Sequence, residues 1–215
     1  MEGVLIVGMG LPGSGKSSVF CALADLLVRQ GKDTSLYREP EESEWPLAVS
    51  DRDRSGCISA LTWFRSIRVP MLFQAAQDRD NGKIAIVDSY YDKLIHLYFD
   101  RPNFEWLMPN NDPYRACYQK LIDLDYKSLP NANCVITFIV ENERWSHLVK
   151  GRGRDLDRKS DLLNYHYMQS EFLEASNTYC LSQGVRHIQY NNNETNLAAA
   201  AEDLYQQLVN NGVIK

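Results

Sequence analysis

The chain has 215 residues, enough for one domain with a sizeable hydrophobic core. Its hydrophobic fraction of 44% and charged fraction of 24% are those of an ordinary globular protein and exclude an intrinsically disordered chain. A formal net charge of −5 argues against a nucleic-acid binder, so anionic ligands must be met by local clusters of Lys and Arg.

The sequence lacks the signals of a secreted or membrane protein. No apolar run approaches the length of a membrane span, and the apolar N-terminal stretch is too short for a signal peptide. The 5 cysteines are scattered without paired spacing, which indicates neither a zinc site nor a disulfide framework. We therefore expect one cytoplasmic domain over residues 1–215, with reduced thiols and no membrane contact.

A glycine-rich segment follows the first apolar run, residues 4–7, and precedes a helical pattern. Its sequence, Gly10-Leu11-Pro12-Gly13-Ser14-Gly15-Lys16-Ser17, fits the spacing G-x-x-x-x-G-K-[ST] of a phosphate-binding loop between a strand and a helix. Glycine permits backbone conformations closed to other residues, so successive N–H groups can turn toward a phosphate chain beside the positive end of the helix. We expect ATP to contact Gly10, Gly13, Ser14, Gly15, Lys16, Ser17 and Ser18.

Two side chains of this loop carry the expected chemistry. Lys16 provides a positive charge for the β- and γ-phosphates, and the Ser17 hydroxyl is a ligand for a phosphate-bound Mg²⁺. The alternative is a glycine-rich turn that binds nothing, but such a turn has no use for adjacent Lys and Ser residues.

A charged triplet follows the next predicted strand. Residues 19–27 have helical spacing up to the stop at Gly31, and residues 34–37 predict a short strand that delivers Arg38-Glu39-Pro40. Glu39 can accept a proton from an attacking hydroxyl or bind a sugar hydroxyl, and Arg38 can neutralise an acceptor phosphate. The alternative for this pair is a surface ion pair.

Helical spacing returns over residues 59–77, where Pro70 is expected to break the helix or to begin a new one. Residues 83–88 then form an apolar run ending in Asp88, the pattern of a buried parallel strand. Asp88 can hold magnesium or orient the acceptor, and it can also cap the next helix together with Ser89.

An irregular insertion is predicted at residues 99–115, which are rich in Pro, Asn and aromatic residues. A helix is expected at 118–129, and the apolar run at 134–140 predicts another buried strand. The same patterns predict the remaining elements: helices at 143–149, 162–179 and 197–209, and a strand at 185–190.

The segment at about 150–159 is dense in arginine and contains two glycines. Such a segment can close over a bound nucleotide as a lid and exclude water. Its arginines, Arg152, Arg154 and Arg158, can then stabilise the transferred phosphoryl group. A solvated charged loop is the alternative.

Strands that alternate with helices predict an α/β fold with a parallel sheet and helices on both faces. We expect the three-layer α/β/α sandwich of P-loop NTPases, with a central, mostly parallel five-stranded sheet and a lid segment. Ligands of such sheets lie beyond the carboxyl ends of the strands. The glycine-rich loop, Arg38-Glu39, Asp88 and the arginine-rich segment all follow strand ends, so the sequence predicts one shared cleft.

These motifs resemble, in order and approximate spacing, those of thymidylate kinases and the related deoxynucleoside kinases. The resemblance runs from the N-terminus to about residue 175 and rests on Gly10–Ser17, Arg38-Glu39-Pro40, Leu72-Phe73, Asp88-Ser89-Tyr90 and Arg152–Arg158. It implies that Arg38 contacts the acceptor phosphate, as in thymidylate kinases. It also implies that Glu39, in a Glu-Pro segment followed by Trp45, is the general base, as in the nucleoside kinases.

The acceptor side departs from the thymidylate kinase pattern. The resemblance implies that Phe73 stacks on the acceptor base, whereas the alternative places it in a helix core. Thymidylate kinases have Arg four residues beyond that Phe, where this chain has Gln77, and Arg where it has Ser89. Gln74 and Gln77 can instead read a base edge through paired hydrogen bonds.

The sequence therefore predicts a phosphotransferase that uses ATP and Mg²⁺ and acts on a nucleoside or nucleoside monophosphate. Its partners would be a nucleoside triphosphate donor and a small-molecule acceptor, not nucleic acid, and a homodimer is left open. Two alternatives stand beside this hypothesis: a P-loop kinase for a non-nucleotide alcohol, and an ATP-binding regulatory protein that has lost its acceptor site.

Overall fold

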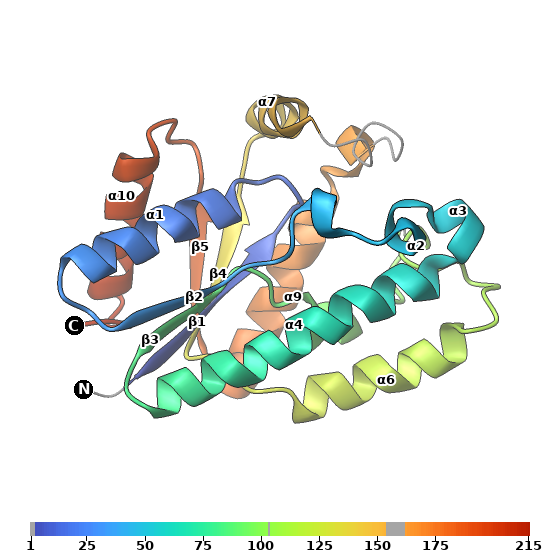
Figure 1. Ribbon diagram of the computed structural model, residues 1–215, viewed down its shortest axis with the longest axis horizontal. Coiled ribbons are helices and arrows are strands. Elements are labelled where there is room, and N and C mark those ends of the chain that lie inside the picture. Colours follow the sequence, from blue (N-terminus) through green and yellow to red (C-terminus); the bar gives the residue numbers. More distant parts are fainter. Residues whose placement is uncertain (1–2, 103, 154–161) are drawn as a thin grey trace.

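The computed structural model of the chain describes residues 3–102, 104–153 and 162–215 (Figure 1). Its centre is a five-stranded sheet with the order β2-β3-β1-β4-β5, and every neighbouring pair is parallel. The strands are β1 (Val4–Gly10), β2 (Thr34–Tyr37), β3 (Ile84–Val87), β4 (Cys134–Ile139) and β5 (Arg186–Asn191). The predicted α/β fold and five predicted strands are confirmed.

Helices cover both faces of this sheet (Figure 1). One face carries α1 (Lys16–Arg29) and α10 (Leu197–Asn210), and the other carries α4 (Cys57–Asp80), α6 (Arg115–Ser128) and α9 (Met168–Gln183). Among the described helices, none is long and apolar enough to cross a bilayer. The shorter elements are η1 (Glu42–Glu44), α2 (Leu47–Ser50), α3 (Arg52–Ser55), α5 (Tyr91–Leu94), η2 (Ile95–Leu97), α7 (Asn142–Arg152) and η3 (Leu162–Tyr165).

The alternation of side chains along β1 divides the core into two halves. Leu5, Val7 and Met9 pack with α4 and α9, whereas Val4 and Ile6 pack with α1 and α10. Successive side chains of a strand point to opposite faces, so a central strand between two helical layers must be apolar throughout. All seven residues of β1 are buried, and this burial fixes the start of the glycine-rich loop at the carboxyl edge of the sheet.

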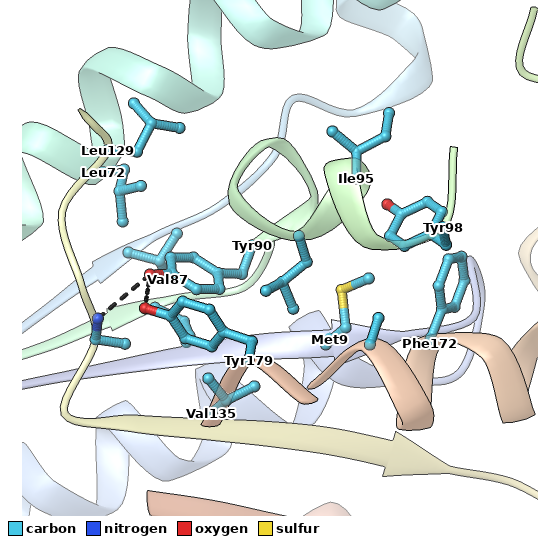
Figure 2. Packing of buried hydrophobic residues seen from close by; sticks show 14 of the residues in the cluster. Met9, Leu72, Val87, Tyr90, Ile95, Tyr98, Leu129, Val135, Phe172 and Tyr179 are labelled. Atoms are coloured by element: carbon cyan, nitrogen blue, oxygen red, sulfur yellow. Dashed lines mark hydrogen bonds between the residues drawn. The ribbon is translucent and has the colours of Figure 1, made fainter. Parts of the chain in front are cut away.

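The core on the α4 and α9 side contains a buried polar network (Figure 2). The hydroxyl groups of Tyr90 and Tyr179 are 3.0 Å apart, and Tyr90 donates to the carbonyl oxygen of Pro130 at 2.7 Å. Tyr90 also accepts from the Ala132 N–H at 3.3 Å. These bonds pair polar groups that would otherwise be buried without partners, and they connect α5, α9 and the turn before β4.

The structure corrects two predicted helix boundaries. Pro70 does not break the helix, because α4 continues from Cys57 to Asp80 through it. The proline lies on the exposed side, where its missing N–H removes one helical hydrogen bond and solvent can reach the freed carbonyl. The long helix expected from residue 162 begins only at Met168, after a short 3₁₀ turn.

The predicted insertion at 99–115 has no strand or helix among its described residues until α6 begins at Arg115. It is nevertheless anchored in the core, because Phe99, Phe104 and Met108 are fully buried. Arg101 adds ion pairs to Glu171 and Glu174 on α9 at 2.6 and 2.7 Å. Hydrophobic burial therefore holds this segment without regular secondary structure.

Candidate functional site

The glycine-rich loop has the backbone conformation that its sequence predicts. Gly10, Gly13 and Gly15 have φ angles of 138°, 78° and 84°, which other residues rarely adopt. Space is a second reason for glycine, because a Cβ atom at Gly10 would lie 2.8 Å from the Phe138 carbonyl oxygen. At Gly15 it would lie 2.6 Å from the side-chain amide nitrogen of Asn192. Replacing these glycines would therefore strain the loop.

Two side chains hold the loop from outside. Trp145 on α7 donates its indole N–H to the Pro12 carbonyl at 2.9 Å, and the Asn192 amide donates to the Ser14 carbonyl at 2.7 Å. Both bonds use carbonyl oxygens and so do not consume the loop N–H groups that a phosphate would need. The Ser14 hydroxyl is buried without a hydrogen-bond partner in the described structure, and the predicted contact Ser18 is exposed in the first turn of α1. These features fit a polyphosphate cradle.

Lys16 lies inside the loop, where its ammonium group is hydrogen-bonded to uncharged oxygen atoms. Its Nζ donates to the carbonyls of Gly10 at 3.2 Å and Leu11 at 3.0 Å, and to the hydroxyl of Tyr91 at 3.1 Å. Burial lowers the pKa of Lys16 to about 8, although the nearby carboxylates of Glu39 and Asp88 act to raise it. A buried cation that has no direct ion pair among the described residues is suited to an anionic ligand.

Ser17 and Asp88 form the candidate metal pair. The Ser17 hydroxyl donates to Asp88 Oδ2 at 2.7 Å, and the Glu39 N–H donates to Asp88 Oδ1 at 3.1 Å. Burial, followed by the charge of Glu39, raises the pKa of Asp88, so a cation here would relieve an unfavourable negative charge. No group of three or more His, Cys, Asp or Glu residues forms a metal site within the described ranges. A magnesium ion at Ser17 and Asp88 would therefore complete its shell with phosphate and water oxygens.

Arg68 on α4, which the sequence did not predict as a site residue, holds the carboxylates of Glu39 and Asp92. It binds Asp92 through two hydrogen bonds of 2.6 and 3.1 Å and binds Glu39 at 3.0 Å. The Arg68 side chain is 12% exposed and that of Asp92 is 7% exposed. Burial alone would raise the pKa of Glu39, but Arg68 and Lys16 hold it below its ordinary value. Glu39 is therefore an ionised carboxylate beside Asp88.

Aromatic rings surround the Arg68 guanidinium. Its central carbon lies 5.3 Å from the ring centre of Phe64 and 5.6 Å from that of Tyr91. Trp45 packs edge-on against Phe64 at 5.2 Å, and its indole N–H donates to the Pro40 carbonyl at 3.2 Å. The segment after Glu39 is thereby fixed to α4.

Three predicted acceptor contacts are not brought to this site. The spacing Phe-x-x-x-Arg, which the resemblance locates at positions 73 and 77, is instead present at Phe64 and Arg68. Nine residues of helix rotate a side chain by about 180°, so Phe73 and Gln77 face the opposite side of α4. Phe73 is 50% exposed, and the side chain of Gln74 donates to that of Gln77 at 3.3 Å. The sequence signal that could have pointed to Arg68 was this Phe-x-x-x-Arg spacing at Phe64 and Arg68.

Arg38 lies at the mouth of the site. It forms an ion pair with Glu41 at 2.9 Å, in which the two side chains are 45% and 56% exposed. Both residues line a pocket of about 420 Å³. Its lining consists of Arg38, Glu39, Pro40, Glu41, Glu44 and Ile67.

Arg152 is the predicted lid residue that the structure places at the loop. It ends α7, and its guanidinium carbon lies 3.1 Å from the position that a Cβ atom of Gly13 would take. Its charge also acts to lower the pKa of Lys16, which agrees with this position. The other two predicted residues, Arg154 and Arg158, lie outside the described residues.

The chain was also compared with known proteins. No protein-family model matches it, and no curated protein matches it either. The structure gathers the glycine-rich loop, Ser17, Asp88, Glu39 and Arg152 at one edge of the sheet, and it adds Arg68, Asp92 and Tyr91.

Proposed function

We propose that this protein is a P-loop kinase that transfers a phosphoryl group from ATP to a nucleoside, with magnesium as cofactor. The main support is a continuous set of contacts from Ser17 through Asp88 to Glu39 and Arg68. These contacts bring the glycine-rich loop, Ser17 and Asp88 beside the ionised carboxylate of Glu39, which supports the proposal of a nucleotide cradle and metal ligands next to a proton acceptor. Phosphoryl transfer needs this combination of positioned donor, cation and acceptor hydroxyl. The proposal includes the three-layer fold identity of P-loop NTPases.

The half of the site that would bind the ATP donor, called the donor half, is built around the glycine-rich loop. Its N–H groups and Lys16 would bind the phosphates, while Ser17 and Asp88 would hold magnesium. Bound magnesium neutralises charge on the phosphate oxygens. Arg152, against Gly13, is suited to stabilise the transferred group from the side opposite the sheet.

The half of the site that would bind the phosphoryl acceptor, called the acceptor half, includes Glu39. Its lowered pKa keeps it able to accept a proton near neutral pH, and Arg68 orients its carboxylate. Phe64 and Trp45 supply aromatic surface close to it, which suits a planar base. The residues thus provide a proton acceptor, with aromatic side chains close to it, for one hydroxyl-bearing ligand.

The balance of charge favours an uncharged nucleoside over a nucleoside monophosphate. The pocket beside Glu39 is lined by three carboxylates, Glu39, Glu41 and Glu44, and by one guanidinium, that of Arg38. Arg38 is already paired with Glu41, and Arg68 is paired with two carboxylates. A phosphate dianion in this pocket would meet net negative charge. An acceptor that brings only hydroxyl groups avoids this repulsion.

The proposal is tested by coupled measurement of ADP release from Mg-ATP across a panel of nucleosides, nucleoside monophosphates and sugar alcohols. We expect nucleoside-dependent turnover that exceeds monophosphate-dependent turnover. Turnover that is lost in the Asp88→Asn variant would link the activity to this site. Intact Mg-ATP binding with no acceptor-dependent turnover would instead identify an ATP-binding regulatory protein, and turnover with sugar alcohols alone would identify a non-nucleotide acceptor.

The affinity for ATP should depend on the protonation of Lys16. Because the pKa of Lys16 in the free protein is about 8, and bound phosphates favour the charged ammonium, the contribution of Lys16 to affinity should be constant below about pH 7. It should fall by up to about tenfold per pH unit above pH 8. Calorimetric titration with ATP in EDTA measures this without a divalent cation. The Lys16→Arg variant stays charged and should not follow this profile, and a flat wild-type profile up to about pH 10 would contradict the expectation.

A further inference from the structure

Tyr91 touches the two halves of the site with two different parts of its side chain. Its hydroxyl lies in the donor half, where it donates to the Gly10 carbonyl at 2.5 Å and accepts from Lys16 Nζ at 3.1 Å. Its ring centre lies 5.6 Å from the Arg68 guanidinium carbon, in the acceptor half, and at the same distance from Lys16 Nζ. The residue begins α5, three positions after Asp88. No sequence motif pointed to it.

The three oxygens around Lys16 match the number of its donors. An ammonium group carries three N–H donors, and Gly10, Leu11 and Tyr91 supply one acceptor each. Because the Tyr91 proton is directed to the Gly10 carbonyl, the lone pairs of its oxygen are free to accept from Lys16. The ammonium is therefore satisfied within the protein, and a phosphate can bind it only by exchange with one of these oxygens.

We propose that Tyr91 is a positioning residue. It holds the Lys16 ammonium in a withdrawn position, against the loop carbonyls, until nucleotide phosphates take the place of the Tyr91 hydroxyl. This inference rests on the proposed function, because it requires that Lys16 bind a nucleotide. Of the three acceptors, the Tyr91 hydroxyl is the one that a substitution removes without replacing a loop residue, although the bond that it donates to the Gly10 carbonyl is lost with it. Tyr91→Phe deletes this oxygen and keeps the ring against Arg68.

The test compares Tyr91→Phe with Tyr90→Phe. Tyr90 is the adjacent tyrosine, but its hydroxyl bonds to Pro130 and Tyr179 in the core. Loss of one competing hydrogen bond should tighten Mg-ATP binding by about three- to tenfold in Tyr91→Phe. The Kd of Tyr90→Phe should equal that of the wild type. If Tyr91 instead supported bound nucleotide, Tyr91→Phe would weaken Mg-ATP binding. If its role were purely structural, Mg-ATP binding would be unchanged.

A second measurement, in nucleotide-free protein, asks whether Tyr91 acts through Lys16. Urea midpoints are measured for Lys16→Met and Tyr91→Phe, singly and combined, and the same cycle is made with Tyr90→Phe. We expect non-additive shifts for the Tyr91 pair and additive shifts for the Tyr90 pair. Additive shifts for Tyr91, or an unchanged or weaker Kd in folded Tyr91→Phe, would overturn the inference alone. Absence of Mg-ATP binding in the wild type would overturn the proposed function and the inference with it.

Discussion

Replacing Glu39 with Gln is expected to lower kcat for phosphoryl transfer to a nucleoside by about 10²- to 10⁴-fold. The amide keeps the shape of the side chain and a hydrogen bond to Arg68 but cannot accept the proton of the attacking hydroxyl. Mg-ATP affinity should be nearly unchanged, because the residues proposed to contact the phosphates and the cation are Lys16, Ser17 and Asp88 instead. Steady-state kinetics with saturating ATP, together with calorimetric Mg-ATP binding, measure both quantities.

Glu41→Gln is the matched control for this substitution. Glu41 lines the same pocket, but it is more than half exposed and its observed ion-pair partner is Arg38. Its variant should retain most of the wild-type kcat. If Glu39→Gln keeps more than about a tenth of the activity, Glu39 is not the proton acceptor, and its role is limited to positioning Arg68.

The α/β fold and the conformation of the glycine-rich loop could be predicted from sequence because their signals are local. Continuous apolar runs such as residues 4–7 indicate strands buried on both faces, and the positions of Gly10, Gly13 and Gly15 indicate a loop that needs positive φ angles. Asp88 was found because it directly follows such a run. These inferences needed no knowledge of which segments pack together.

The acceptor half could not be predicted in the same way. Asp92 and Arg68 are 24 residues apart and meet only after α4 and α5 pack together. Two Phe-containing patterns occur on α4, and the sequence alone does not decide which face of that helix turns toward the site. Tertiary packing decides it, by burying Leu72 and placing Phe73 in solvent while Phe64 contacts Arg68 and Trp45. The assumed break at Pro70 also separated residues that share one helix.

Arg68→Met should lower the free energy of unfolding by about 3–5 kcal/mol. The substitution retains an unbranched side chain but removes the guanidinium that pairs Asp92 and Glu39. Asp92 is almost fully buried, so its charge would remain in a poorly solvated place without its bidentate partner. Urea unfolding followed by circular dichroism at neutral pH, with linear extrapolation, measures the loss.

Arg38→Met tests whether burial is the cause, because it also removes an arginine that pairs with a glutamate. Both side chains of that pair are exposed, so solvent screens the interaction and the loss should stay below about 1 kcal/mol. The double variant Arg68→Met/Asp92→Leu should recover much of the lost stability, since it removes the buried charge at position 92 and leaves only Glu39, whose side chain is 31% exposed, without its arginine partner. Equal losses of unfolding free energy for Arg68→Met and Arg38→Met would show that the buried ion pairs of Arg68 with Asp92 and Glu39 do not stabilise this part of the protein.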